Sequence, residues 1–407
     1  MKKRSKKIKN TLYVKILSFI IPLLIAVLIV GLNSDYLIKK YMLYIVIALI
    51  VIFTGLFIYN LIGIFKNRVK IVNKKRKILN IIYFIVLSIY LAGEITMLVL
   101  LYGPSPKFRD WLITTAMQTM DHQYLCQIFY SDKDIKASKD NNFIVEVNED
   151  TNEELITWQD KYDNEYDYQI LERDEDAIYK LIEFEVNGQK AYLAAIYKPE
   201  RVSVAVTKHL NVKGQYVTRM AQDNKAVLAI NGGNFIDLNH NSSGGTPLGI
   251  TISKGQVITS EVTTSTYGNI CLTRNNVLML SRGNTAEGLI NKGARDCVTA
   301  GPFLIVNGKS SFTKGNGGWG YAARSAIGQR EDGIILLLVV DTNATRSKGA
   351  SMHDLTRIME NYGAVNASNL DGGTSSVMAI NYEIINDPID STLAHRTRPV
   401  ASSIIVK

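Results

Sequence analysis

The stretch TRIMENYGAVNASNLDGG, Thr356–Gly373, has a counterpart earlier in the chain, TRMAQDNKAVLAINGG, Thr218–Gly233. In both stretches Thr-Arg precedes Ala-Val by eight residues, and a short apolar run then ends in Gly-Gly. This order predicts a helix, a buried strand and a tight turn, used twice in one fold. We expect both turns to end strands at one edge of a sheet and to face one pocket, where backbone N–H groups can hold an anion.

Further signals support the second helix and its turn. Ser351 and Asp354 have the form of a capping box at the start of the helix. Apolar side chains follow at helical spacing: Met352, Leu355, Met359 and Tyr362. At the turn, DGGTSS places six small or polar residues between apolar runs, beginning at Asp371. A surface turn needs fewer, so the stretch indicates close approach of the backbone and hydroxyl groups to a ligand.

The positive charge of the chain lies in its first quarter. Residues 1–102 carry 16 Lys or Arg and two acids, a net charge of +14. Residues 103–407 carry 30 basic and 35 acidic side chains, a net charge of −5, and the two parts sum to the overall +9. Nucleic-acid binding requires a basic face on the folded part. The charge distribution therefore argues against a nucleic-acid partner.

Three nearly uncharged segments predict transmembrane helices: Ile16–Leu32, Tyr41–Phe65 and Ile78–Tyr102. The first is the shortest and contains Pro22, so a signal peptide is the alternative interpretation. Its flank has no small-residue cleavage site, and two further spans follow it. These features favour three transmembrane helices. The membrane is therefore an expected partner of the chain.

Lysine and arginine counts predict the orientation of the helices. The N-terminal tail has six basic residues, the loop after the second span has seven, and the loop between the first two spans has two. By the positive-inside rule the tail and the second loop are cytoplasmic, and the chain after Tyr102 is outside. Glu94, within the third span, motivates an alternative role as a transport or signalling subunit, since intramembrane acids often have functions.

The chain is predicted to have three parts: residues 1–102 as membrane anchor, 103–177 as a membrane-proximal helix with a polar linker, and 178–407 as a folded domain. The helix is expected over residues 109–131. Residues 132–176 are rich in Asp, Glu, Asn and Lys, which is typical of a solvated linker. The domain begins with two strands around an Asn-Gly turn, and short strands with Gly turns continue to its end.

Cysteine and histidine usage gives no sign of a metal site. Three cysteines do not make a disulfide framework, although Cys271 and Cys297 could pair, which the sequence leaves open. The histidines are scattered without the spacing of metal ligands: His122, His209, His240, His353 and His395. A binuclear metal phosphodiesterase is therefore disfavoured. We expect no cofactor, and a requirement for a divalent cation such as Ca²⁺ stays open.

Five motifs occur in one order along the domain: AVLAINGGNF, GPFLIVNGK, ARSAIG, the stretch from LLLVVD to LDGGTSS, and RPVASSIIV. Together they resemble the phosphodiester glycosidase family, over residues 178–407. The resemblance implies an α/β (α+β) domain with a mixed central sheet, which the charge counts above place outside the cell. It also implies hydrolysis of the bond between sugar C1 and a phosphate oxygen, as in N-acetylglucosamine-1-phosphodiesters.

The resemblance also implies site residues, carried over position by position. The candidates for catalysis are Asp371, Asp341 and Asn231. The candidates for binding substrate and phosphate are Arg324, Arg398, Gly232, Gly233, Gly372 and Gly373, joined by the hydroxyl residues Thr374 and Ser375. Each residue alone also has a structural interpretation as a turn brace, a cap or an ion pair. The chain departs from the family pattern at Asn234, at Thr374 and in the stretch DTNATR that starts at Asp341.

These residue types suit cleavage of a sugar-1-phosphodiester. The leaving group is a phosphate monoester with a second pKa of about 6, so a strong general acid is less necessary than in ordinary glycoside cleavage. The reaction needs a carboxylate near C1 and a clamp of arginine and backbone N–H groups for the phosphate. The sequence therefore predicts a multi-pass membrane hydrolase that acts on phosphodiesters of envelope polysaccharides or glycans. A non-catalytic envelope-glycan binding protein with the same fold is the alternative.

Overall fold

The computed structural model describes residues 2–34, 39–67, 74–118, 123–236, 243–263, 267–345, 348–390 and 392–407. The chain divides into two units, Met1–Asp140 and Asn141–Lys407. The sequence led us to expect boundaries after residues 102 and 177. The structure differs because the polar segment that starts at Asn141 packs on the second unit.

The first unit is helical. Its helices are α1 (Lys2–Asn33), α2 (Lys39–Asn67), α3 (Lys74–Tyr102), α4 (Pro106–Gln118), α5 (Gln123–Phe129) and α6 (Asp132–Asn141). Two described segments are long and apolar enough to cross a membrane, Tyr13–Asn33 in α1 and Ile78–Tyr102 in α3. The described apolar segment of α2, Tyr44–Gly55, is shorter, and parts of the expected span Tyr41–Phe65 have side chains outside the described residues.

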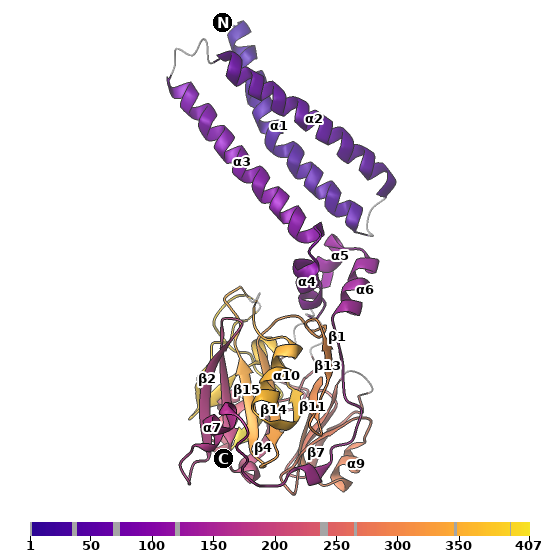
Figure 1. Ribbon diagram of the computed structural model, residues 1–407, viewed down its shortest axis with the longest axis vertical. Coiled ribbons are helices and arrows are strands. Elements are labelled where there is room, and N and C mark those ends of the chain that lie inside the picture. Colours follow the sequence, from indigo (N-terminus) through magenta and orange to yellow (C-terminus); the bar gives the residue numbers. More distant parts are fainter. Residues whose placement is uncertain are drawn as a thin grey trace. The chain divides into compact units, whose positions relative to one another are not determined.

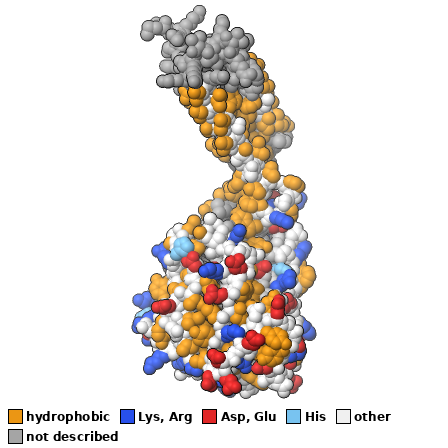
Figure 2. Space-filling view, turned by 60° about the vertical axis from the view of Figure 1, so that its left-hand side comes forward, with side chains coloured by type: hydrophobic (Ala, Val, Ile, Leu, Met, Phe, Trp, Pro, Cys, Tyr) orange, Lys and Arg blue, Asp and Glu red, His pale blue; other side chains and the backbone are white. Residues whose placement is uncertain are grey.

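Large apolar side chains cover the described surface of the long helices (Figure 2). Val27, Val51 and Ile89 are 58%, 66% and 68% exposed. Exposing such area to water costs about 25 cal/mol per Å², so the surface favours a membrane environment. In α3 the hydroxyl of Tyr90 hydrogen-bonds the carboxylate of Glu94, which gives this acid a partner within its own helix.

The membrane-proximal helix expected over residues 109–131 is two helices, α4 and α5, with residues 119–122 outside the described part. The two helices share a small core in which Ile113 and Cys126 are fully buried. Cys126 is a free thiol. The segment therefore packs within the first unit, as its apolar side chains require.

The second unit contains three main sheets (Figure 1). The seven-stranded central sheet has the order β12-β11-β16-β14-β15-β3-β2. The C-terminal sheet has the order β18-β17-β5-β19-β4, and the disulfide sheet has the order β7-β6-β10-β8-β9. The strands of the central sheet are β2 (Tyr179–Val186), β3 (Gln189–Ile196), β11 (Phe303–Val306), β12 (Lys309–Ser310), β14 (Arg324–Arg330), β15 (Ile335–Val340) and β16 (Ala364–Asn369).

The other strands complete the unit. The C-terminal sheet consists of β4 (Val202–Val206), β5 (Leu228–Asn231), β17 (Met378–Ile380), β18 (Glu383–Ile384) and β19 (Ser402–Val406). The disulfide sheet consists of β6 (Ile250–Ser253), β7 (Gln256–Ser260), β8 (Gly268–Thr273), β9 (Leu278–Ser281) and β10 (Ala294–Ala300). A separate short pair joins β1 (Phe143–Val145) to β13 (Phe312–Lys314).

All pairings among the described strands are antiparallel. The mixed central sheet expected from the family resemblance is therefore wrong in its strand directions, although the α/β class holds. The physical reason lies in the connections. Strands β2 and β3 are joined by a two-residue turn, Asn187 and Gly188, both with positive φ, and such short turns reverse the chain.

The central sheet is buried on both faces. In β15, Leu337 and Val339 face the core shared with the other two sheets, whereas Leu336 and Leu338 face the core under helix α10 (Met352–Asn361). Figure 1 shows α10 lying over β14 and β11. Successive residues of a strand point to opposite faces, so burial of both faces explains the uninterrupted apolar run of β15.

Single helices cover the outer faces of the other sheets. Helix α8 (Val217–Asn224) packs through Met220 on the C-terminal sheet, and α9 (Ala286–Asn291) packs through Leu289 on the disulfide sheet. Cys271 of β8 lies directly opposite Cys297 of β10, and the two form a disulfide. The sequence left open whether these two cysteines pair, and the structure shows that they do.

The repeated helix, strand and turn are confirmed. Helix α8 leads into β5 and the first Gly-Gly turn, and α10 leads into β16 and the second. The Ser351 side chain and Asp354 form the expected capping box. The two strands belong to different sheets, however, since β5 lies in the C-terminal sheet and β16 in the central sheet. The expectation of one sheet edge is therefore wrong, and the turns approach each other from two sheets.

The polar segment after Asn141 is structured. Strand β1 pairs with β13, and helix α7 (Glu165–Leu171) buries Ile170 against the central sheet. Two short 3-10 helices, η1 (Glu153–Leu155) and η2 (Pro199–Arg201), lie in the same unit. Composition indicated a solvated linker because charged residues usually stay in water. Here Asp167 is buried with a partner, its Oδ1 lying 2.8 Å from Nη1 of Arg330.

This buried ion pair predicts an acid-sensitive stability. Burial raises the pKa of Asp167, but hydrogen bonds from Arg330 and from backbone N–H groups outweigh burial and hold that pKa below its usual value. The stabilisation is therefore complete above the unfolded pKa of about 3.9 and is lost as the pH falls through the folded pKa. We expect Asp167→Asn to lower the free energy of unfolding by about 3 kcal/mol at pH 7 and by less at about pH 3.

Urea unfolding of the full chain in detergent, followed by tryptophan fluorescence, measures this difference. Asp163→Asn is the matched control, because Asp163 pairs with Lys161 at the surface and should change the free energy of unfolding by less than about 1 kcal/mol. Equal losses in the two variants, or a loss for Asp167→Asn that does not depend on pH, would contradict the role of the buried pair.

Candidate active site

The two Gly-Gly turns meet directly. The backbone N–H of Asp371 donates to the carbonyl oxygen of Gly232 at 3.2 Å, and Nδ2 of Asn231 donates to the carbonyl oxygen of Asp371 at 2.6 Å. Strand β5 ends at Asn231 and β16 ends at Asn369, so the contact joins the ends of strands from two sheets. We expected the turns to face one pocket; the structure brings them into direct contact, and their junction is the candidate active site.

Asn231 holds this junction together. It is fully buried, and its Oδ1 accepts hydrogen bonds from the Ser325 hydroxyl at 2.7 Å and from the Val377 N–H at 3.3 Å. Its Nδ2 is engaged by the carbonyl oxygen of Asp371. An amide with both ends bonded to protein atoms positions its neighbours. The geometry therefore supports a positioning role for Asn231, where the sequence suggested catalysis.

The first Gly-Gly turn needs glycine because the backbone is crowded there. A Cβ on Gly232 would lie 2.6 Å from the Ser402 hydroxyl oxygen, and one on Gly233 would lie 2.6 Å from the Thr299 carbonyl oxygen. Ser402 belongs to β19 and Thr299 to β10. Both glycines thus let the turn sit between the C-terminal sheet and the disulfide sheet, which brings all three sheets to the candidate site.

The carboxylate of Asp371 is half-buried at this junction. Its Oδ1 lies 3.4 Å from Nδ2 of Asn234. Nearby, Oδ1 of Asn234 and the hydroxyl of Ser376 are buried and have no hydrogen-bond partner among the described residues. Buried polar atoms nearly always have partners, and unpaired ones often mark bound water or ligand. The junction therefore contains buried hydrogen-bonding atoms that the described residues leave unsatisfied.

Arg324 is a buried cation beside the second turn. Its Nε donates to the carbonyl oxygen of Ala350 at 3.2 Å, and its Nη2 donates to the carbonyl oxygen of Trp319. Within the described residues no carboxylate lies within ion-pair distance of Arg324. Burial lowers the pKa of Arg324 to about 10, and the charge of Asp371 acts in the opposite direction. The group therefore stays charged at neutral pH.

The residues behind Asp371 surround this guanidinium. A Cβ on Gly372 would lie 3.5 Å from Nη1 of Arg324. The N–H of Gly373, which has a φ of +64°, donates to the carbonyl oxygen of Ala323 at 2.8 Å. Because Gly372 has no side chain, none lies against Nη1 at this position. A buried positive charge without a carboxylate partner among the described residues is a candidate site for an anion.

The remaining predicted residues lie around the junction. The Thr374 hydroxyl is 3.4 Å from the carbonyl oxygen of Ile389, and Ser375 is buried in the 3-10 turn η4 (Gly373–Ser375). The guanidinium carbon of Arg398 lies 4.6 Å from the ring centroid of Phe235, which follows the first turn. The two predicted arginines thus lie at the two turns, Arg398 at the first and Arg324 at the second.

Both carboxylate oxygens of Asp341 accept hydrogen bonds from the segment at Asn386 and Asp387. Its Oδ1 accepts from Nδ2 of Asn386 at 2.8 Å, and its Oδ2 accepts from the N–H of Asp387 at 3.0 Å. The same Nδ2 of Asn386 lies 3.0 Å from the carbonyl oxygen of Ser376. Burial raises the pKa of Asp341, while the hydrogen bond from Asn386 lowers it. These contacts support a role in fixing the segment after Asp371, where the sequence suggested a catalytic carboxylate.

Sequence reasoning missed two aromatic residues. The rings of Tyr267 and Trp319 lie 6.2 Å apart in an edge-to-face arrangement, and the Trp319 carbonyl oxygen accepts the bond from Arg324. Burial raises the pKa of Tyr267, and the charge of Asp371 raises it further. Trp319 lies in the glycine-rich stretch GNGGWGY. A large aromatic residue among glycines was the feature of the sequence that could have identified it.

Potential metal ligands do not gather at the junction. Across the parts of the chain that the structure describes, no three His, Cys, Asp or Glu side chains form a group that could hold a metal ion. What the junction offers is one half-buried carboxylate, one buried guanidinium, amide and hydroxyl groups, and two aromatic rings. This set can bind an anion and place a carboxylate beside it.

Comparison with known proteins supports the family resemblance over the C-terminal part of the chain. The family model for phosphodiester glycosidase matches residues 224–407, a range that contains both Gly-Gly turns. The SPbeta prophage-derived uncharacterized protein YomE of Bacillus subtilis strain 168 is 31% identical over 183 residues. That match covers 43% of this chain and 27% of the relative, so the chain spans about a quarter of the relative's length.

Solved structures were compared as well. The zebrafish N-acetylglucosamine-1-phosphodiester alpha-N-acetylglucosaminidase catalytic domain, auto-inhibited by its pro-peptide, has a TM-score of 0.48 and 16% identity, covering 57% of this chain and 85% of that one. A hypothetical protein from Synechocystis has a TM-score of 0.37 and 19% identity, covering 56% of this chain and 62% of that one.

The junction predicts that Asn231 is required for stability. Asn231→Ala leaves the carbonyl oxygen of Asp371, the Ser325 hydroxyl and the Val377 N–H without this partner in a buried place. Each unpaired buried group costs about 1–3 kcal/mol, so we expect a loss of at least about 3 kcal/mol in the free energy of unfolding.

Ser325→Ala is the matched control, since it removes one partner of Asn231 and should cost about 1 kcal/mol. Urea unfolding of the two variants in detergent decides the point. Similar small losses in both would mean that Asn231 does not hold the turns together.

Proposed function

We propose that the domain that matches the phosphodiester glycosidase family hydrolyses the C1–O bond of sugar-1-phosphodiesters. The observation that carries the proposal is the buried guanidinium of Arg324, which has no carboxylate partner within ion-pair distance among the described residues and lies beside the turn of the half-buried Asp371. A phosphodiester supplies the negative charge that the guanidinium lacks. The sugar attached to that phosphate then has its C1 beside a carboxylate.

In the proposed reaction, water attacks C1, the C1–O bond breaks and the electron pair leaves with the phosphate oxygen. The products are a free sugar and a phosphate monoester. Positive charge develops at C1 in the oxocarbenium-like transition state, and the Asp371 carboxylate would stabilise it or take a proton from the attacking water. Arg324 and the backbone N–H groups of the turns would hold the phosphate.

The substrate class follows from the groups around the junction. Tyr267 and Trp319 offer aromatic surface next to the charged groups, and such surfaces suit the apolar faces of sugar rings. Amide and hydroxyl groups of Asn234 and Ser376 are available for sugar hydroxyls. We propose a phosphodiester of an envelope polysaccharide or glycan as substrate. A non-catalytic glycan-binding protein is the second candidate, because the same groups would bind the same ligand.

We further propose that the domain lies outside a membrane that the N-terminal helices cross more than once. The apolar surfaces of α1 and α3 and the basic tail and loop support this location. The disulfide between Cys271 and Cys297 supports it as well, because disulfides persist in oxidising compartments.

Bond choice and the role of Asp371 can be tested together. A panel of sugar-1-phosphodiesters hydrolysed in ¹⁸O-water should give label in the sugar product, because water attacks C1. Asp371→Asn should lower turnover by at least about a hundredfold, the low end for loss of a general base, while substrate binding and melting temperature change little.

Asp387→Asn is the matched control, since Asp387 has a carboxylate that is 59% exposed on a neighbouring segment, and its turnover should stay near that of the unchanged protein. Label in the phosphate product would overturn the proposed bond choice. Binding of the panel without turnover in the unchanged protein would instead support the glycan-binding alternative.

The orientation can be tested on intact cells. Protease added from outside should remove the chain after Tyr102 and spare an N-terminal tag, because six basic residues in the tail and seven in the second loop favour the cytoplasm. A cytoplasmic marker protein that stays intact serves as the control. A second unit that stays protected in intact cells, and is cut only after lysis, would refute the proposed orientation.

A further inference from the structure

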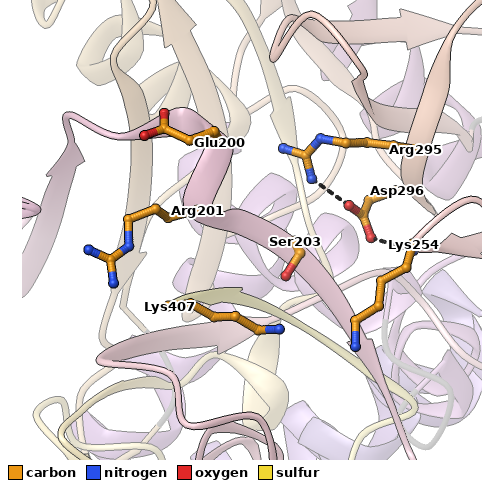
Figure 3. A pocket seen from close by; sticks show the side chains of 7 residues that line it. All are labelled: Glu200, Arg201, Ser203, Lys254, Arg295, Asp296 and Lys407. Atoms are coloured by element: carbon orange, nitrogen blue, oxygen red, sulfur yellow. Dashed lines mark hydrogen bonds and ion pairs between the residues drawn. The ribbon is translucent and has the colours of Figure 1, made fainter.

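A charged pocket lies at the ends of β10 and β19 that are remote from the candidate active site. Figure 3 shows the side chains that line it. The pocket has a volume of about 570 Å³ and is lined by basic residues, with Ser203 among them. In β19, Ser402 contacts the first Gly-Gly turn, while Lys407 follows the strand's other end and lines the pocket. The four residue-to-residue steps from Ser402 to Val406 correspond to roughly 14 Å.

Two of the charged residues in this pocket have structural partners. Nη1 of Arg295 lies 2.6 Å from Oδ2 of Asp296, and the guanidinium also donates to backbone carbonyl oxygens, including that of Val202 at 2.8 Å. Oδ1 of Asp296 accepts from the N–H groups of Val204 and Lys254, at 3.1 and 3.0 Å. Arg295 and Asp296 therefore form part of the pocket wall, and their opposite charges cancel.

Three basic side chains remain: Arg201, Lys254 and Lys407. None of them has a carboxylate within ion-pair distance among the residues that the structure describes. The lining contains one further acidic residue, Glu200. The positive charges of the lining therefore outnumber its negative charges. Cations gathered in one cavity repel one another, and an anion of matching size relieves the repulsion.

The floor of the pocket offers a hydrogen-bond donor. The hydroxyl oxygen of Ser203 is buried and has no hydrogen-bond partner among the described residues. Figure 3 shows this hydroxyl among the ends of the Lys254, Lys407 and Arg295 side chains. A buried hydroxyl without a partner costs free energy that a bound oxygen anion would recover.

We propose that this pocket binds a phosphate group of an extended anionic polymer, at a distance from the bond that is cleaved. The proposal rests on the proposed function in one respect, namely that the substrate chain carries repeated phosphodiesters. A cavity of this size accommodates a sugar-phosphate or alditol-phosphate unit. A chain that reaches both sites must exceed the roughly 14 Å between the two ends of β19, so the pocket selects long anionic chains over short ones.

The test uses the full chain in non-ionic detergent and a fluorescent oligo(glycerol phosphate) of about ten units, long enough to exceed the strand length above. Binding is followed by fluorescence anisotropy, with inorganic phosphate as a competitor. We expect the double variant Lys254→Gln, Lys407→Gln to weaken binding of the oligomer by about tenfold or more. Hydrolysis of a substrate with one phosphodiester should stay unchanged, because neither lysine lies at the junction of the turns.

Two further variants keep the result decisive. Lys254→Arg with Lys407→Arg preserves the charge and should retain binding, which separates loss of charge from loss of fold. Lys292→Gln with Lys309→Gln removes two positive charges elsewhere in the unit, from exposed pairs with Asp150 and Glu149, and should also retain binding. Unchanged binding in the Lys254, Lys407 glutamine variant would overturn the proposal, as would an equal loss in the Lys292, Lys309 control.

The same experiment keeps the two proposals apart. If the unchanged protein hydrolyses no sugar-1-phosphodiester, the proposed activity fails, while the anisotropy measurement still decides whether the pocket binds the oligomer. If inorganic phosphate binds but the oligomer binds no better, the pocket is a site for free phosphate and the polymer proposal fails.

Discussion

The buried amide of Asn231 is the interaction on which the site depends. It bonds the backbone of Asp371 after β16, the hydroxyl of Ser325 in β14 and the N–H of Val377 before β17. A fully buried amide must have its hydrogen bonds satisfied, so these segments can take only positions that satisfy them. The central sheet and the C-terminal sheet are thereby joined at one point, and the Asp371 carboxylate acquires a defined place.

Strand β14 carries two buried arginines with different partners, one at each end. At one end Arg330 is buried between Asp167 and Asp332, and these carboxylates outweigh the effect of burial and raise its pKa. At the other end Arg324 is buried among carbonyl oxygens, and burial lowers its pKa. Carboxylates neutralise the first charge, whereas the second has no carboxylate partner among the described residues. Arg324 is therefore the stronger functional candidate, although both arginines are buried.

Local patterns predicted much of this architecture. The capping box at Ser351, the Asn-Gly hairpin between β2 and β3, and the two helix-strand-turn units are all present. These features depend on neighbours within a few residues, so the sequence reports them directly. The segment with Asp167 was misread as linker because its charged residues find partners far along the chain, and composition does not register a partner 163 residues away.

The sequence by itself determined the residues of the candidate site: motifs predicted the two Gly-Gly turns, Asp371, Arg324 and Arg398. Only the tertiary structure decided which groups each of them contacts. Asn231 and Asp341 have residue types that often act in catalysis. In this structure, however, their polar atoms are hydrogen-bonded to the second turn and to Asn386. The direction of strand pairing, the disulfide and the contact between the turns also emerged only in three dimensions. The physical reason is that a side chain's role depends on which groups satisfy its hydrogen bonds and charge, and those groups come from strands distant in sequence.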